Sequence, residues 1–144
     1  MSSDSRLSVL IADDQLLLAE SLRQALEPQY KVVAIVGDGV AAIQGVERHL
    51  PDILLLDISM PVMNGLQAAE HIAQYCPSVR IIFLTCHTDH IYIEEAFNRG
   101  AAGYVRKGSI AELDEAIHSS GRPTVSPHLR PLNRIDTSVQ VPLR

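Results

Sequence analysis

Five short apolar segments recur along the chain, and each is followed by residues whose apolar positions repeat at helical spacing. The segments are Leu7–Ala12, Lys31–Val36, Ile53–Leu56, Arg80–Leu84 and Gly103–Val105. The middle segments are continuously apolar rather than alternating, which is typical of parallel strands that helices cover on both faces. The pattern therefore predicts five buried strands of one parallel sheet.

The segments between these strands have the periodicity of amphipathic helices. The predicted helices cover Gln15–Leu26, Val40–His49, Leu66–Tyr75, Ile91–Arg99 and a last helix that begins at Ser109. Ser109 and Glu112 have the spacing of a capping box, and Ile110, Leu113 and Ile117 form the apolar stripe of the last helix. Strands that alternate with helices, joined by right-handed crossovers, predict a (βα)₅ α/β fold with a doubly wound, five-stranded parallel sheet.

The regular pattern stops near Gly121. Residues 121–144 hold four prolines and show no sustained periodicity, so we expect one domain over residues 1–120 and a Pro-rich linker or tail over residues 121–144. Residues 1–120 carry 8 basic and 16 acidic side chains. This acidic balance argues against a body that binds nucleic acid, because neutralising phosphates requires a basic surface.

Targeting and membrane signals are not visible in the sequence. The first six residues are polar, no apolar run approaches the ~20 residues of a membrane span, and the two cysteines are typical of reduced thiols. We expect a cytoplasmic protein that does not enter a membrane.

Polar residues stand at the ends of the predicted strands. Asp13 and Asp14 follow the first strand, Asp57 the third and Thr85 the fourth, and Lys107 lies near the end of the fifth. Because ligands of a doubly wound sheet bind at the carboxyl ends of its strands, we expect these side chains to converge. Each alone has an ordinary explanation, such as a helix cap, a turn, a strand residue or a surface charge. The set favours a shared site.

The chemistry of this set is that of phosphoryl transfer. Three clustered carboxylates repel one another unless a cation lies between them, and hard oxygen ligands suit Mg²⁺. A lysine and a hydroxyl can stabilise charge on the oxygens of an incoming phosphoryl group, while a carboxylate can act as its nucleophile.

Four sequence blocks resemble the response regulator receiver domains of two-component systems. They are Asp13-Asp14 after LSVLIA, DILLLDISMPVMNG from Asp52 to Gly65, IIFLT ending at Thr85, and GYVRKG around Lys107. The resemblance covers residues 7–120 and implies a flavodoxin-like receiver domain. It implies that Asp57 accepts a phosphoryl group from a histidine kinase, and that Mg²⁺ binds to Asp13, Asp14, Asp57 and the backbone carbonyl of Ser59.

The resemblance also implies a conformational switch. Thr85 and Lys107 would contact the phosphoryl oxygens, and Tyr104 would turn inward as Thr85 moves; the alternative is that Tyr104 is a half-buried strand residue without such a role. Such a protein catalyses only its own phosphorylation and dephosphorylation. Two positions depart from the family: Cys86 replaces a small residue after Thr85, and Gly108 replaces the proline that often follows the lysine.

Two further patterns have simpler explanations. Gly37–Ala42 fits G-x-G-x-x-A and precedes Asp57 as in a dinucleotide fingerprint, but it follows the second strand, and a short turn into the next helix explains it. His87 and His90 flank Asp89 and suggest a transition-metal site, although solvated loop histidines are the favoured interpretation.

The segment Gly121–Pro131 resembles the linker that follows LuxR/NarL-type receivers, in which a DNA-binding domain comes next. We therefore favour a transcription regulator whose output domain is absent from this chain, with DNA bound only through that domain. A stand-alone receiver that acts by protein–protein interaction is the alternative. The expected partners are a histidine kinase and, after phosphorylation, a second copy of the chain. A hydrolase that passes through an aspartyl phosphate and a degenerate interaction module are the competing functions.

Overall fold

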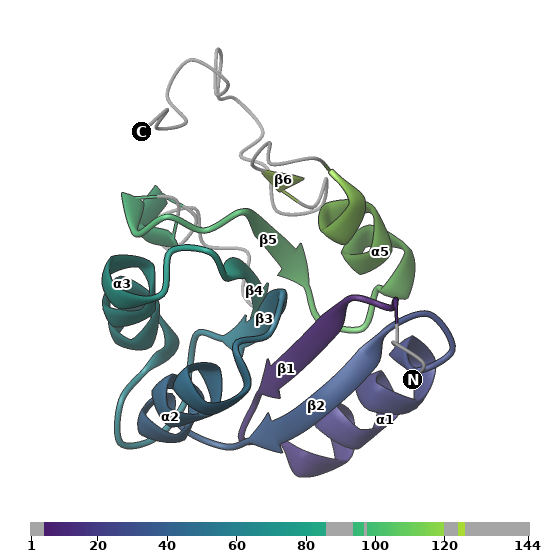
Figure 1. The fold of residues 1–144 in the computed structure, drawn as a ribbon, viewed down its shortest axis with the longest axis horizontal. Coiled ribbons are helices and arrows are strands. Elements are labelled where there is room, and N and C mark those ends of the chain that lie inside the picture. Colours follow the sequence, from purple (N-terminus) through teal and green to yellow (C-terminus); the bar gives the residue numbers. More distant parts are fainter. Residues whose placement is uncertain (1–4, 86–93, 97, 120–123, 126–144) are drawn as a thin grey trace.

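One parallel sheet runs through the centre of the molecule (Figure 1). The computed structural model describes residues 5–85, 94–96, 98–119 and 124–125. The strands are β1 (Ser8–Ala12), β2 (Lys31–Val36), β3 (Ile53–Asp57), β4 (Arg80–Thr85), β5 (Gly103–Arg106) and β6 (Thr124–Val125), in the order β2-β1-β3-β4-β5-β6. The five predicted strands are confirmed. The two-residue β6, which lies in the segment expected to be a tail, pairs in parallel with β5 and extends the sheet.

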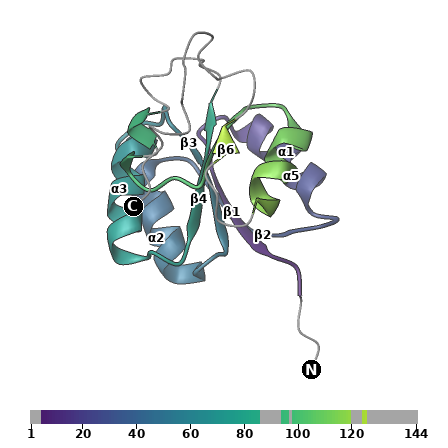
Figure 2. The same cartoon turned by 90° about the horizontal axis from the view of Figure 1, so that it is seen from above.

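Helices cover both faces of the sheet, as the alternating pattern predicts. The helices are α1 (Leu16–Leu26), α2 (Gly39–His49), α3 (Gly65–Tyr75) and α5 (Ile110–His118). Figure 2 shows α2 and α3 on one face and α1 and α5 on the other. Residues 94–96 and 98 are helical and lie within the predicted helix Ile91–Arg99. Residues 91–93 and 97 of that predicted helix lie outside the described residues. No helix in the part of the chain that the structure describes has the length and apolarity to cross a bilayer.

The core consists of two layers because successive residues of a strand point to opposite faces. In β3, which is buried at every position, Leu54 and Leu56 pack toward α2 and α3, whereas Ile53 and Leu55 pack toward α1 and α5. Each fully buried leucine or isoleucine contributes roughly 1.5–3 kcal/mol. Burial on both faces therefore explains why these strands are continuously apolar in the sequence.

Polar N-caps start three of the helices. Asp38 caps α2 by accepting from the Ala41 amide, and Ser109 caps α5 by accepting from the Glu112 amide at 3.3 Å. Asn64 forms a capping box with Gln67 at the start of α3, which the sequence analysis did not identify. These helix starts lie at the carboxyl ends of the strands, the edge where the polar residues were expected to meet.

The apolar stripe of α5 is narrower than predicted. Leu113 and Ile117 are buried, but Ile110 is 39% exposed because it lies in the first turn, at the rim of a groove between α1 and α5.

Candidate functional site

Three carboxylates meet at the carboxyl edge of the sheet. Asp13 follows β1 and Asp57 ends β3, and these two strands are neighbours at the centre of the sheet. One carboxylate oxygen from each of Asp13, Asp14 and Asp57 can be chosen so that all three lie within 4.8 Å of one another. Asp13 and Asp57 are buried, whereas Asp14 is exposed. The cluster is therefore half enclosed and open to solvent on the side of Asp14.

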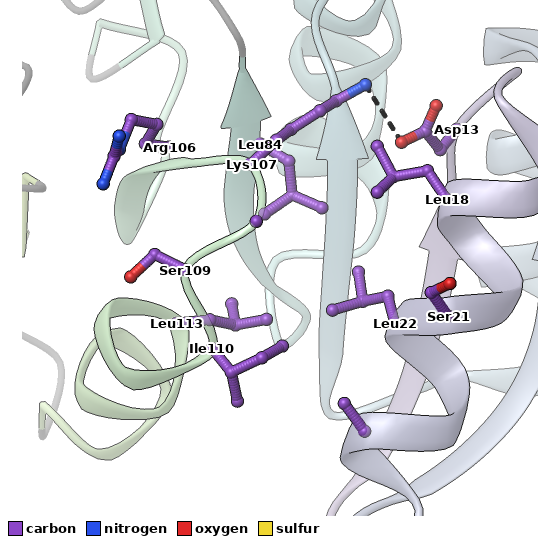
Figure 3. A pocket seen from close by; sticks show the side chains of 12 residues that line it. Asp13, Leu18, Ser21, Leu22, Leu84, Arg106, Lys107, Ser109, Ile110 and Leu113 are labelled. Atoms are coloured by element: carbon purple, nitrogen blue, oxygen red, sulfur yellow. Dashed lines mark ion pairs between the residues drawn. The ribbon is translucent and has the colours of Figure 1, made fainter.

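Lys107 reaches into this cluster from the end of β5. Its Nζ lies 3.0 Å from Asp13 Oδ2 and 3.1 Å from Asp57 Oδ2, and Figure 3 shows the side chain extended toward Asp13. The Lys107 amide donates to the carbonyl of Thr85 at 2.8 Å, which ties the ends of β4 and β5 together. The buried Thr85 thus stands at the same edge as the lysine and the acids.

Burial raises the free energy of the ionised cluster. Burial raises the pKa of Asp57 to about 6; the hydrogen bond and charge of Lys107 oppose this shift, while the charge of Asp13 adds to it. Burial alone would lower the pKa of Lys107, but its hydrogen bonds to Asp13 and Asp57 and the charges of these acids together outweigh burial, so its pKa is raised. One firmly protonated ammonium therefore faces two buried acids and an exposed third, which leaves the cluster suited to a further cation.

The sequence matches the family model for the response regulator receiver domain over residues 9–118. The chain is 36% identical over 118 residues to the transcriptional regulatory protein DegU of Brevibacillus brevis, a match that covers 80% of this chain and 50% of DegU. It is 33% identical over 129 residues to the probable transcriptional regulatory protein NarL of Mycobacterium tuberculosis, covering 86% of this chain and 60% of NarL.

Among solved structures, it is similar to a LuxR-family two-component response regulator from Aurantimonas sp. SI85-9A1. The TM-score is 0.81 at 35% identity, covering 87% of this chain and 93% of that chain. The chain belongs to the response regulator receiver family. More narrowly, it is a receiver of the LuxR/NarL type, and it spans about half the length of DegU and three-fifths that of NarL.

Receivers of this family are signalling proteins rather than conventional enzymes, and they generally use Mg²⁺. The donor set of this receiver fits such an ion, because three carboxylates offer hard oxygen ligands within a small volume. Ser59, whose carbonyl the resemblance adds to this set, is an exposed residue just beyond Asp57.

Local hydrogen bonds in the receiver show which ordinary role, helix cap or turn, the strand-end aspartates have. Asp13 accepts from the Gln15 amide at 2.9 Å, and Asp57 accepts from the Ser59 amide at 3.2 Å, so each acid makes a short-range, turn-like bond. Neither Asp13 nor Asp14 is the N-cap of α1, which is Gln15. Asp13 and Asp57 each keep a second oxygen that faces Lys107. The turn-forming role therefore coexists with the shared site.

The sequence analysis missed Gln15 as a residue of the site. Its side-chain oxygen accepts a hydrogen bond from Lys107 Nζ at 2.9 Å instead of capping α1. A glutamine after two aspartates has no distinctive spacing, so nothing in the sequence indicated this contact.

Tyr104 and Gly108 flank the lysine in β5 and the following loop. Tyr104 is fully buried, with its ring centroid 6.2 Å from that of Phe83, so the half-buried position of the alternative is wrong, and the turning of Tyr104 stays a prediction. Gly108 has a φ of +89°, a value that a proline cannot adopt and that glycine adopts without strain. Cys86, His87 and His90, the other residues singled out in the sequence, lie outside the described residues.

An apolar groove opens beside the lysine, between α1 and α5 (Figure 3). Its volume is about 200 Å³, and Asp13 and Lys107 form part of its lining. Leu18 and Leu22 face Leu113 across it. The charged cluster of the receiver therefore borders an apolar groove that lies between α1 and α5.

Proposed function

We propose that this receiver accepts a phosphoryl group from a histidine kinase on Asp57, with Mg²⁺ held by Asp13, Asp14, Asp57 and the Ser59 carbonyl. The observation that carries the proposal is the buried carboxylate of Asp57, which lies 3.1 Å from Lys107 Nζ within the three-carboxylate cluster. The nucleophile, the ammonium and the metal ligands thus lie in one cluster, as phosphoryl transfer requires.

The reaction is a displacement at phosphorus. A carboxylate oxygen of Asp57 forms the new P–O bond while the P–N bond of the phosphohistidine breaks, and the electron pair of that bond goes to the imidazole nitrogen of the kinase. A pKa of about 6 leaves Asp57 mostly ionised at pH 7, so it is available as a nucleophile. Bound Mg²⁺ supplies positive charge for the carboxylates and for the phosphoryl oxygens.

Lys107 and Thr85 hold the phosphoryl oxygens in this proposal. Because Lys107 already bonds to Asp13 and Asp57, its ammonium needs only a small shift to bond to a phosphoryl oxygen on Asp57. The Thr85 hydroxyl moves toward the same group, and the buried Tyr104 shifts into the space behind it. The resulting change in the surface around β5 and α5 is the proposed signal.

The output we propose is transcription control through a LuxR-type DNA-binding domain. DegU and NarL are named transcriptional regulatory proteins, and this chain matches only part of each. Phosphorylation would promote a homodimer of the cytoplasmic regulator, and DNA would be bound only through that further domain. The reading frame beyond Arg144 tests this directly: a stand-alone receiver predicts a stop codon there.

Beryllofluoride with Mg²⁺ tests phosphoryl acceptance, because it mimics an acyl phosphate. We expect amide NMR shifts around Asp57, Thr85 and Tyr104, and no such shifts in Asp57→Asn. Asp52→Asn is the matched control, since Asp52 lies at the opposite edge of the sheet and should respond as the wild type does. An unchanged wild-type spectrum, with Mg²⁺ present, would refute the proposal.

The competing functions predict different results. A hydrolase would turn over many molecules of a small phosphorylated substrate per protein, whereas a receiver shows only slow loss of its own phosphoryl group. A degenerate interaction module would bind Mg²⁺ poorly in an equilibrium titration.

A further inference from the structure

The first residue of α2 makes a backbone contact with the loop that follows Asp57. The amide of Gly39, which is buried, donates to the carbonyl of Met63 at 3.0 Å. Met63 belongs to residues 58–64, which connect Asp57 to α3 and include Ser59. Helix α2 is thereby attached to the segment that carries the expected carbonyl ligand of the metal.

Only glycine fits at position 39. A Cβ atom there would lie 2.3 Å from the Met63 carbonyl oxygen and 2.8 Å from the Met63 Cβ. Since non-bonded heavy atoms pack at about 3.5 Å, a side chain would displace the loop by roughly 1 Å. Gly37, two residues earlier, differs: its added Cβ would lie 4.0 Å from the nearest atom, the Asp14 Cα, which is ordinary contact.

The other end of the loop is held in the same way. The Gly65 amide donates to the Ile58 carbonyl at 2.8 Å, and a Cβ at Gly65 would lie 2.2 Å from the carbonyl oxygen of Asp57. Between the two contacts, Val62 has a φ of +68°, and the Met63 amide donates to the Pro61 carbonyl at 2.7 Å. A β-branched residue in this region is strained, and such strain persists only where the surroundings over-determine the conformation.

We infer that Gly39 is a positioning residue for the metal site: through Met63 it fixes the loop that follows Asp57. The inference rests on the proposed function of that site. It also explains the G-x-G-x-x-A pattern without a nucleotide, because the second glycine allows a close approach of the Met63 carbonyl instead of a phosphate. Helix α2, which contributes no side chain to the carboxylate cluster, would in this way affect metal binding.

Gly39→Ala and Gly37→Ala test this inference as a matched pair. Isothermal titration with Mg²⁺ should give a dissociation constant about 10- to 100-fold higher for Gly39→Ala, the cost typical of disturbing the support of a metal ligand. The dissociation constant of Gly37→Ala should stay within about twofold of the wild type, as for an ordinary surface substitution. The rate of phosphorylation by acetyl phosphate should recover in Gly39→Ala as Mg²⁺ approaches saturation.

Failure of the inference and failure of the proposed function give different results. If the wild type neither binds Mg²⁺ nor takes up phosphate, the proposed function is wrong. If the wild type does both and Gly39→Ala matches it in Mg²⁺ affinity, only the role of Gly39 is overturned.

Gly39→Ala must be folded for this comparison, and wild-type amide NMR provides a test that does not depend on the variant. We expect the Gly39 amide to be protected from hydrogen exchange and to shift with the same Mg²⁺ midpoint as the Met63 amide. The Gly45 amide in the middle of α2 serves as the control and should not shift. A Gly39 amide that exchanges freely and ignores Mg²⁺ would overturn the inference.

Discussion

Charged side chains have different partners at the two edges of the sheet. At the amino edge, Asp52 accepts hydrogen bonds from the Ser8 amide at 2.8 Å and its hydroxyl at 3.1 Å, and Arg80 donates to the last carbonyls of α5 at 2.7 and 3.1 Å. Both of these charged side chains form hydrogen bonds to neutral polar groups of the fold. At the carboxyl edge, the buried Asp13 and Asp57 share one ammonium, and the charge of Asp13 adds to the rise in the pKa of Asp57.

The difference indicates which edge serves stability and which serves function. Hydrogen bonds between a charged side chain and backbone groups stabilise the folded state. Clustered buried carboxylates destabilise the folded state when they are ionised, and such groups gather at functional sites. Substitutions at the amino edge should therefore change stability, and substitutions at the carboxyl edge should change phosphoryl chemistry.

The largest effect should come from Lys107→Met. Losing the ammonium beside Asp57 should slow phosphoryl uptake from acetyl phosphate by about 10²-fold, the usual cost of removing one group that stabilises the transferring charge. Lys31→Met at the exposed start of β2 is the control and should react at the wild-type rate. Equal rates of phosphoryl uptake in both variants would contradict the proposed difference between the two edges.

Arg80→Met should have its main effect on stability. The variant loses two charge-assisted hydrogen bonds to the carbonyls of Ala116 and Ile117, which should lower the free energy of unfolding by about 2–3 kcal/mol in urea titrations. Phosphoryl uptake per folded molecule should stay within about twofold of the wild type, as expected for a distant site. Arg48→Met, at an exposed position of α2, should leave both quantities unchanged.

Asp57→Asn should stabilise the protein in the absence of Mg²⁺. Because the pKa of Asp57 is raised from 3.8 to about 6, its ionisation removes stability as the pH rises through this range. At pH 7 the variant should therefore be more stable by about 2–3 kcal/mol, and the part of the pH dependence due to this group should vanish. Urea titrations from pH 4 to 7 in EDTA measure this; a variant less stable at pH 7 would show that the ionised carboxylate is favourable.

Val62→Asn should give the smallest effect. Asparagine tolerates a positive φ better than a β-branched residue does, so the variant should gain about 1 kcal/mol of stability. Val62 is 83% exposed, so the substitution removes little buried apolar surface. A loss of stability would mean that the loop does not hold this residue under strain.

Much of the fold could be predicted from the sequence because several independent patterns indicate the same architecture. Continuous apolar strands, helical periodicity and polar strand ends all indicate the same doubly wound sheet, and β2 begins and ends at the predicted residues. The convergence of Asp13, Asp57, Thr85 and Lys107 followed from the topology alone, since parallel strands bring their carboxyl ends to one edge.

The contacts that depend on atomic distances could not be predicted. The bond between Gln15 and Lys107 depends on how far two side chains reach, and the contact of Gly39 with Met63 depends on how α2 is placed against a loop 24 residues away in sequence. Strand β6 is too short to have a periodicity, and Ile110 follows the helical stripe but is exposed because it lies at a groove.

The most direct measurement of the central claim is to locate the phosphoryl group after incubation with acetyl phosphate. Peptide mass spectrometry should find it on Asp57 when Mg²⁺ is present, and on no residue when EDTA replaces Mg²⁺. Phosphate on a different residue, or uptake on Asp57 that is indifferent to Mg²⁺, would contradict a metal-assisted acceptor at the carboxyl edge.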